Sequence, residues 1–97
     1  MPKAYLIANV DITDPETYES YKARNPEIFG RHGGKFLVRG GTQNVVEGDA
    51  KSRTVILEFP SFEAAQAAYD DPDYVDNRQT RFAASDTGFA IIVEGAE

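Results

Sequence analysis

The sequence predicts an α+β domain of the ferredoxin-like type, with the order β-α-β-β-α-β and a four-stranded antiparallel sheet that carries its helices on one face. Four apolar runs rich in β-branched and aromatic residues predict the strands, at residues 4–10, 35–40, 53–59 and 88–95. Helical segments with Asp or Ser caps lie between the first and second runs and between the third and fourth. The length of 97 residues allows one domain, which we assign to residues 1–97.

The first helix is predicted from its two ends. Asp14 is suited to cap it, Pro15 to occupy its first position, and a glutamate follows near the positive end of the helix dipole. Because a proline inside a helix removes a hydrogen bond, the Asn-Pro pair at 25–26 predicts a kink or a restart near Asn25. The glycine pair at 33–34 predicts the end of the helix, since glycine readily takes the left-handed conformation there.

A second glycine pair follows the strand "KFLVRG". We interpret Gly40 and Gly41 as a bulge that bends this strand so that it continues into "TQNVVEG", with Arg39 paired to an acid such as Glu58. An anion role is open beside this interpretation: Arg39 and the glycine N–H groups could hold a carboxylate or a phosphate.

The second half of the chain repeats the pattern of the first, in which a strand is followed by a helical segment with an N-terminal cap and then by another strand. After a hairpin loop at "GDAKS", the run "RTVILEF" predicts the third strand. Ser61 then caps a helix over "FEAAQAAY", and Asp71 followed by proline begins another helix that runs to about Ser85. The run "GFAIIVEG" predicts the last strand.

Both faces of the predicted sheet are largely apolar. Alternate strand residues form one set, which contains Leu6, Ala8, Val10, Phe36, Val38, Val55, Leu57, Phe59, Phe89, Ile91 and Val93. The other set contains Tyr5, Ile7, Asn9, Leu37, Arg39, Ile56, Glu58, Ala90 and Ile92. The pattern leaves open which set faces the helices. Since the helices cover only one face, the other predicts a homodimer that packs sheet against sheet.

The composition excludes several classes of partner and site. A net charge of −6 argues against binding to nucleic acid and to an anionic membrane surface. The chain has no cysteine and a single histidine, so we expect neither a metal site nor a cofactor. No apolar segment approaches the roughly 20 residues of a membrane span, and the start lacks the features of a signal peptide. We therefore expect a cytoplasmic protein.

Polar residues of the first strand, the first helix and the second strand are candidates for a ligand site between sheet and helices. The candidates are Asn9, Tyr18, Tyr21, Asn25, His32 and Arg39. Phenol and amide tips in a cleft would suit a small aromatic or acidic ligand, whereas ordinary core packing of the tyrosines is the alternative. His32 is suited to act as a general base, or simply to be stabilised as a cation at the end of a helix.

No sequence motif of a known catalytic class is present, and it stays open whether the chain is an enzyme. The acids of the last helix start, Asp70, Asp71, Asp73 and Asp76, are better suited to capping and to solvent than to a metal. We consider two functions. The chain binds or transforms a small organic molecule in a pocket between sheet and helices, or it is a noncatalytic homodimeric module with a structural or interaction role.

The phrases "DITDPETY", "GGKFLVRGG", "VVEG", "SRTVILEFPSFEAA" and "DPDY", in this order, resemble the domain of unknown function 1330 (DUF1330) family. That family is part of the dimeric α+β barrel superfamily, and the resemblance covers about residues 4 to 95. It implies a homodimer of ferredoxin-like subunits and no established reaction. Superfamily relatives include heme-degrading and quinone-forming monooxygenases, chlorite dismutase-like enzymes and muconolactone isomerases, which is an analogy of fold only.

Overall fold

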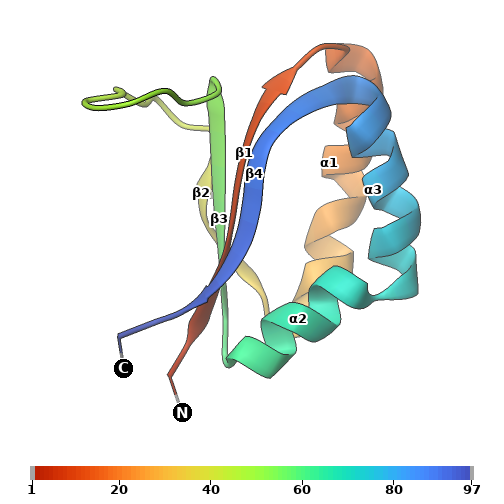
Figure 1. Ribbon diagram of the computed structural model, residues 1–97. Helices are drawn as coiled ribbons and strands as arrows, with labels where there is room; N and C mark the ends of the chain where they lie inside the picture. The colour runs from red at the N-terminus through yellow and green to blue at the C-terminus, as the bar shows by residue number, and fades with distance from the viewer. Residues whose placement is uncertain (1, 97) are drawn as a thin grey trace.

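The computed structural model describes residues 2–96, and it confirms the predicted α+β architecture (Figure 1). Its elements in chain order are β1 (Ala4–Ile12), α1 (Pro15–Gly30), β2 (Lys35–Arg39), β3 (Arg53–Phe59), α2 (Phe62–Asp70), α3 (Pro72–Ala84) and β4 (Ser85–Glu94). The strands form one antiparallel sheet in the order β2-β3-β1-β4. All three of these helices lie on one side of the sheet, and the segment between β2 and β3 extends from the other side (Figure 1).

The helix caps are those that the sequence predicts. The Asp14 carboxylate accepts a hydrogen bond from the Thr17 backbone N–H, at 3.2 Å. The Ser61 hydroxyl oxygen accepts one from the Ala64 N–H, at 3.1 Å, at the start of α2. At the start of α3, Asp71 accepts one from the N–H two residues later, at 2.9 Å. Each cap satisfies a backbone donor that the helix itself leaves free, which fixes where the helix begins.

Helix α1 does not restart near Asn25, because it runs as one helix through Pro26, so of the two predicted outcomes the restart is wrong. Proline has no N–H, so the carbonyl of Lys22, one turn earlier, lacks its usual donor within the helix. Arg39 supplies a donor from outside: its Nη2 lies 2.9 Å from the Lys22 carbonyl oxygen. A contact from a distant strand thus compensates for the proline. The helix ends as predicted, with Gly33 at a φ of 79°.

Strand β2 contains a bulge, but it lies earlier than predicted. The pairing with β3 shifts at Leu37, so that Phe36 lies opposite Leu57 while Arg39 lies opposite Val55. The strand then ends at Arg39, and "TQNVVEG" forms no strand. The predicted bulge at the glycine pair and the predicted strand beyond it are therefore wrong.

The bulge at Leu37 changes the face on which Arg39 lies. Arg39 shares the helix side of the sheet with Val55, whereas Glu58 lies on the opposite side. The predicted pairing of Arg39 with Glu58 is therefore wrong. The Glu58 carboxylate instead lies near the ammonium groups of Lys3 and Lys35, at 3.5 and 3.8 Å.

The register of β4 corrects both predicted face sets, because Ala90 and Ile92 exchange faces with Phe89, Ile91 and Val93. Leu6 lies opposite Ile92, and Ile7 lies opposite Ile91. Phe89, Ile91 and Val93 therefore share a face with Ile7 rather than with Leu6. Periodicity within one strand could not show this, because the relative phase of two strands is set by their pairing.

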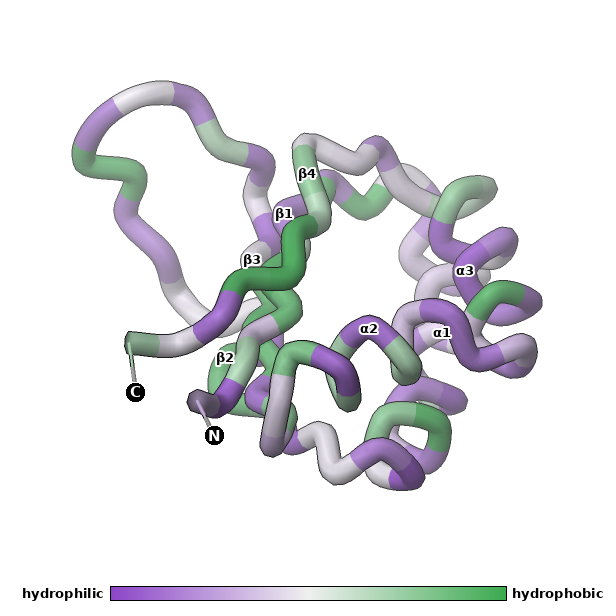
Figure 2. Tube along the Cα trace, turned by 60° about the horizontal axis from the view of Figure 1, so that its bottom comes forward, coloured by the Kyte–Doolittle hydropathy of each residue, from purple (hydrophilic) through white to green (hydrophobic). Residues whose placement is uncertain are grey.

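The helix side of the sheet and the helices enclose the hydrophobic core, which includes Leu6, Val10, Leu57, Phe59, Ile28, Phe29 and Tyr74. The opposite side, which we call the open face, carries Val38, Phe89, Ile91 and Val93, together with Ile7 and Ile56. The first four of these side chains are 37–48% exposed. Figure 2 shows hydrophobic colouring along β3 and β4, so the prediction that both faces are largely apolar is confirmed.

Candidate functional site

A small cavity, the inner cavity, lies between the sheet and helices α1 and α3. Strands β1 and β3 supply an apolar wall that includes Leu6, Val10 and Val55. Its polar and aromatic lining consists of Tyr18, Tyr21, Lys22, Asn25, Phe29, Phe36, Arg39, Arg53, Tyr69, Tyr74 and Arg81. The free space is about 30 Å³, enough for water but well below the roughly 300 Å³ or more of a typical ligand pocket. A larger guest therefore requires side chains at the rim to move.

Two tyrosines from different helices meet in this cavity. The hydroxyl oxygens of Tyr21 and Tyr74 are 2.7 Å apart, and the ring of Tyr18 packs 5.2 Å from that of Tyr21. Burial raises the pKa of Tyr74 above its usual value of 10.0, and the charge of Arg81 only partly opposes this. Burial and the neighbouring Tyr21 likewise raise the pKa of Tyr18. These phenols are therefore neutral, and they act as hydrogen-bonding groups without charge.

Asn25 and Asn77 join α1 to α3 beneath the tyrosines. The Asn77 amide donates to the Asn25 side-chain oxygen at 2.9 Å and to the backbone carbonyl of Tyr21 at 3.0 Å. Both asparagines are buried. The pair therefore fixes the position of α1 relative to α3 at the cavity wall. The Asn25 side-chain oxygen already accepts a hydrogen bond in this structural contact.

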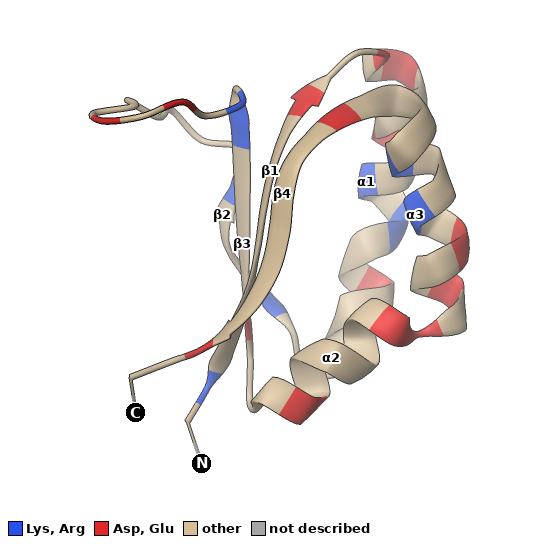
Figure 3. Ribbon diagram, in the orientation of Figure 1, with Lys and Arg blue, Asp and Glu red and all other residues tan. Residues whose placement is uncertain are grey.

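Three arginines reach the cavity from three elements. Arg81, on α3, is only 3% exposed, and Arg53 begins β3. The Nε atoms of both are buried, and among residues 2–96 neither atom has a hydrogen-bond partner. Arg39 lies at the rim, with its guanidinium 4.4 Å from the centre of the Phe36 ring. Figure 3 shows basic residues on α1 and α3 where the two helices run side by side, while acidic residues gather toward the helix ends.

Gly40 makes room for one of these arginines. Its φ is 72°, and a Cβ built on it would lie 2.0 Å from Nη1 of Arg53. Its N–H donates to the carbonyl of Thr54 at 2.9 Å. By contrast, a Cβ on Gly41 would meet nothing within 4 Å. Gly40 is thus required by its backbone conformation and by the nearby Arg53 side chain. Gly41 is not required by either the φ angle or a neighbouring atom.

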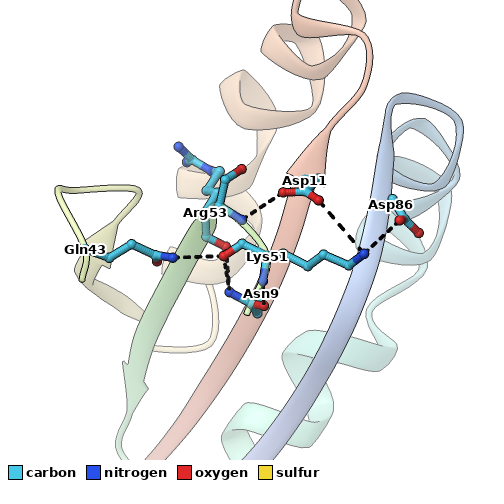
Figure 4. A network of polar contacts seen from close by, with 7 residues as sticks. Asn9, Asp11, Gln43, Lys51, Arg53 and Asp86 are labelled. Atoms are coloured by element: carbon cyan, nitrogen blue, oxygen red, sulfur yellow. Dashed lines mark hydrogen bonds and ion pairs between the residues drawn. The ribbon is translucent and has the colours of Figure 1, made fainter. Parts of the chain in front are cut away.

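Asn9 does not line the inner cavity, although the sequence analysis placed it there. Its side chain lies on the opposite side of the sheet, where it binds the end of the segment between β2 and β3 (Figure 4). Its Oδ1 accepts from the Lys51 N–H at 2.7 Å, and its Nδ2 donates to the Lys51 carbonyl at 3.2 Å. The Lys51 ammonium in turn contacts Asp86 at 3.0 Å. Asn9 therefore anchors this segment and has no free amide for a ligand.

His32 also lies away from the cavity. Its Nε2 is 2.7 Å from the Asp71 carboxylate, so the pair links the end of α1 to the start of α3. The hydrogen bond with His32, together with that from the Asp73 N–H, lowers the pKa of Asp71 below its usual value of 3.8. Two further pairs, Arg31–Asp73 and Arg24–Asp76, join the same helices at 2.9 and 3.1 Å. His32 thus belongs to a set of three polar pairs that link α1 to α3.

We expect Asp71→Asn to lower the free energy of unfolding near neutral pH. The asparagine oxygen can still cap α3, but the charge that pairs with His32 is lost. A lowered pKa means that the stabilisation is present above the unfolded-state value, near 3.8, and is lost as the pH falls through the lower folded-state value. Urea unfolding at several pH values should therefore show the variant and the parent converging below pH 3.8. A gap that is independent of pH would contradict this origin, and Asp70→Asn at the exposed neighbour is the control.

Among residues 2–96, no group of three or more His, Cys, Asp and Glu side chains is placed to share a metal ion. In the same stretch, no helix has both the length and the apolar character that a membrane crossing requires.

Of the six candidate residues, four line the inner cavity: Tyr18, Tyr21, Asn25 and Arg39. The sequence analysis missed Arg53, Tyr74 and Arg81. Arg81 left a signal that could have been used, because helix positions 74, 77, 81 and 84 share one face, and the other members of that face, Tyr74, Asn77 and Ala84, are compatible with burial. No comparable signal marks Arg53, since its position at the start of a strand is equally suited to solvent.

Residues 3–96 match the family described as domain of unknown function (DUF1330). The chain belongs to this family. The DUF1330 chain is also similar to solved structures, which share its fold. A protein of unknown function from Rhodopseudomonas palustris has a TM-score of 0.78 at 22% identity, over 99% of this chain and 84% of that one. No curated protein matches the DUF1330 chain in sequence.

Two structural neighbours carry functional names. The cofactor-independent oxygenase SnoaB of Streptomyces nogalater has a TM-score of 0.71 at 15% identity, over 100% of this chain and 96% of SnoaB. A putative antibiotic biosynthesis monooxygenase of Nitrosomonas europaea has a TM-score of 0.61 at 19% identity, with both chains covered completely, 100% of each. At these identities the likeness establishes the fold that the DUF1330 chain shares with them.

Proposed function

We propose that this DUF1330 protein binds a small organic molecule in the inner cavity. The observation that carries the proposal is the convergence of Tyr18, Tyr21, Asn25 and Arg39 on one enclosed space. Small-molecule sites combine an apolar wall with a few convergent polar groups, and the inner cavity has both. SnoaB, which has this fold, is named as a cofactor-independent oxygenase, and by analogy of fold alone the proposal includes no cofactor.

A thermal-shift screen of small aromatic compounds tests the proposal. A molecule that binds only the folded protein at about 100 times its Kd adds about 2.7 kcal/mol to the free energy of unfolding. We expect phenol, p-cresol, benzamide or benzoate to raise the Tm of the parent. The shift should disappear in Ala8→Leu, which fills the apolar wall of the cavity. It should persist in Ala67→Leu, the same change at an exposed position of α2.

We further propose that the protein is a homodimer through its open face. Val38, Phe89, Ile91 and Val93 leave an apolar surface on the side of the sheet that no helix of the chain covers. A second copy would bury it, and a specific interface of this kind exceeds roughly 1,200 Å² in total. A domain of this size buries roughly 65% of its unfolded surface by itself, so added burial would also stabilise it.

The alternative function is a noncatalytic homodimeric module. The observation in its favour is the size of the inner cavity, about 30 Å³, which resembles a packing defect more than a ligand site. The thermal-shift screen separates the two functions. If no compound raises the Tm, or if a shift survives Ala8→Leu unchanged, the cavity is part of the core and the module is the better description.

A further inference from the structure

The arginines at the inner cavity have no acidic partner among residues 2–96, unlike most of the other basic residues. Among residues 2–96 there are ten lysines and arginines, and six of them form ion pairs with Asp or Glu: Lys3, Lys22, Arg24, Arg31, Lys35 and Lys51. The remaining four are Arg39, Arg53, Arg78 and Arg81. Three of these four line the inner cavity, and the fourth, Arg78, stacks on the ring of Tyr69 at 4.0 Å.

This distribution is unexpected in an acidic chain. The sequence has 16 Asp and Glu residues against 10 Lys and Arg, yet none of the acids within residues 2–96 lines the cavity. A guanidinium group that is buried without a counter-charge is costly, and most buried arginines are therefore paired. Arg81 is 3% exposed, and its Nε has no partner within the described chain. The neighbouring phenols of Tyr18 and Tyr74 are neutral, so they do not supply the missing charge.

We infer that the molecule bound in the inner cavity is a small organic carboxylate, held through Arg81 and Arg53, and this inference rests on the function proposed above. Guanidinium groups bind carboxylates through paired charge-assisted hydrogen bonds, and the two unpartnered Nε atoms are donors of that kind. The apolar wall of β1 and β3 and the ring of Tyr18 would contact the hydrocarbon part. The flat rings around the cavity favour an aromatic or otherwise planar acid.

Arg39 occupies the entrance to this site. Its side chain is exposed and, within residues 2–96, makes one hydrogen bond, to the Lys22 carbonyl that Pro26 leaves without a helical donor. A guanidinium held at the rim attracts an incoming anion. Movement of the Arg39 side chain would also enlarge the cavity, which is otherwise too small for an organic molecule. Arg39 therefore acts at entry, whereas Arg81 and Arg53 hold the bound carboxylate.

Benzoate and benzamide test the inference, because they have nearly the same shape and differ in charge. By titration calorimetry near neutral pH, we expect benzoate to bind the full chain at least about tenfold more tightly than benzamide, since a charge-assisted hydrogen bond is worth about 1.5–3 kcal/mol. Arg81→Met should weaken benzoate binding about tenfold or more. Arg78→Met is the matched control, since Arg78 also lacks an acidic partner but does not line the cavity, and it should retain benzoate affinity.

The Tm of the unliganded variants gives a second and independent readout. An unpaired buried charge opposes folding, so Arg81→Met should raise the Tm without ligand, whereas removal of a structural arginine would lower it. A lowered Tm with unchanged benzoate affinity overturns the inference. Tighter binding of inorganic phosphate than of benzoate overturns the assignment to an organic acid.

The failures of the two proposals look different. If benzamide binds as tightly as benzoate and Ala8→Leu abolishes both, a ligand site exists but it does not select anions, and the inference is wrong. If neither compound binds, or if Ala8→Leu binds both as well as the parent, the proposed function itself is wrong.

Discussion

Ile91→Lys is expected to convert the proposed homodimer to a monomer while the fold of the chain stays intact. Ile91 is 48% exposed on the open face and lies opposite Ile7 near the middle of the sheet. In a twofold-symmetric interface the substitution places two lysines in an apolar surface. At about 1.5–3 kcal/mol for each uncompensated group, the dimer should weaken by roughly a hundredfold or more.

Sedimentation at micromolar concentration measures the outcome directly. The parent should have about twice the chain mass of 10.7 kDa, and Ile91→Lys should approach the mass of one chain. Val75→Lys is the control, because Val75 is 39% exposed but lies on α3, away from the open face. A monomeric parent would refute the homodimer, and loss of dimer in both lysine variants would refute the assignment to this face.

Gly40→Ala is expected to lower the Tm by about 5 to 15 °C. A residue with a Cβ pays about 1–2 kcal/mol in the left-handed conformation that Gly40 adopts, and each kcal/mol shifts the Tm of a domain this size by about 4–8 °C. The new Cβ would also displace the Arg53 guanidinium. Since Arg53 is one of the two proposed carboxylate ligands, benzoate affinity should fall about tenfold as well.

Gly41→Ala is the control that separates the effect of the Gly40 conformation and of the room for Arg53 from a general effect of replacing a glycine. Nothing lies within 4 Å of the position of its Cβ, so we expect little change in the Tm or in benzoate affinity. Thermal unfolding and calorimetry of the two variants side by side make the comparison. Equal Tm losses in both would show that flexibility of the pair, rather than room for Arg53, is what matters.

The fold was predictable from local sequence signals, namely helix caps and apolar runs. Asp14, Ser61 and Asp71 cap their helices as predicted, because the side-chain oxygen of a cap serves a donor only two or three residues away. The β-α-β-β-α-β order followed from these caps and from apolar runs between them. Local reasoning could not predict that the helix would continue through Pro26, because the donor that replaces the missing N–H comes from Arg39, on another element.

The candidate site was predictable in part. Tyr18, Tyr21 and Asn25 reached the cavity because helical periodicity fixes which side chains share a face. Asn9 and His32 did not, since their partners, Lys51 and Asp71, are distant in the sequence and bind them elsewhere.

By itself, the sequence determined the element order, the caps, the two apolar faces of the sheet and the membership of one helix face. The tertiary structure alone decided which strand residues share a face and which arginines lack a partner. A bulge at Leu37 turned Arg39 toward the helices, and pairing with β1 set the phase of β4. The physical reason is range: caps and periodicity act within a few residues, whereas register, burial and charge pairing depend on groups that folding brings together from 17 to more than 50 residues apart, as in the contacts of Arg39 with Lys22 and of Tyr21 with Tyr74.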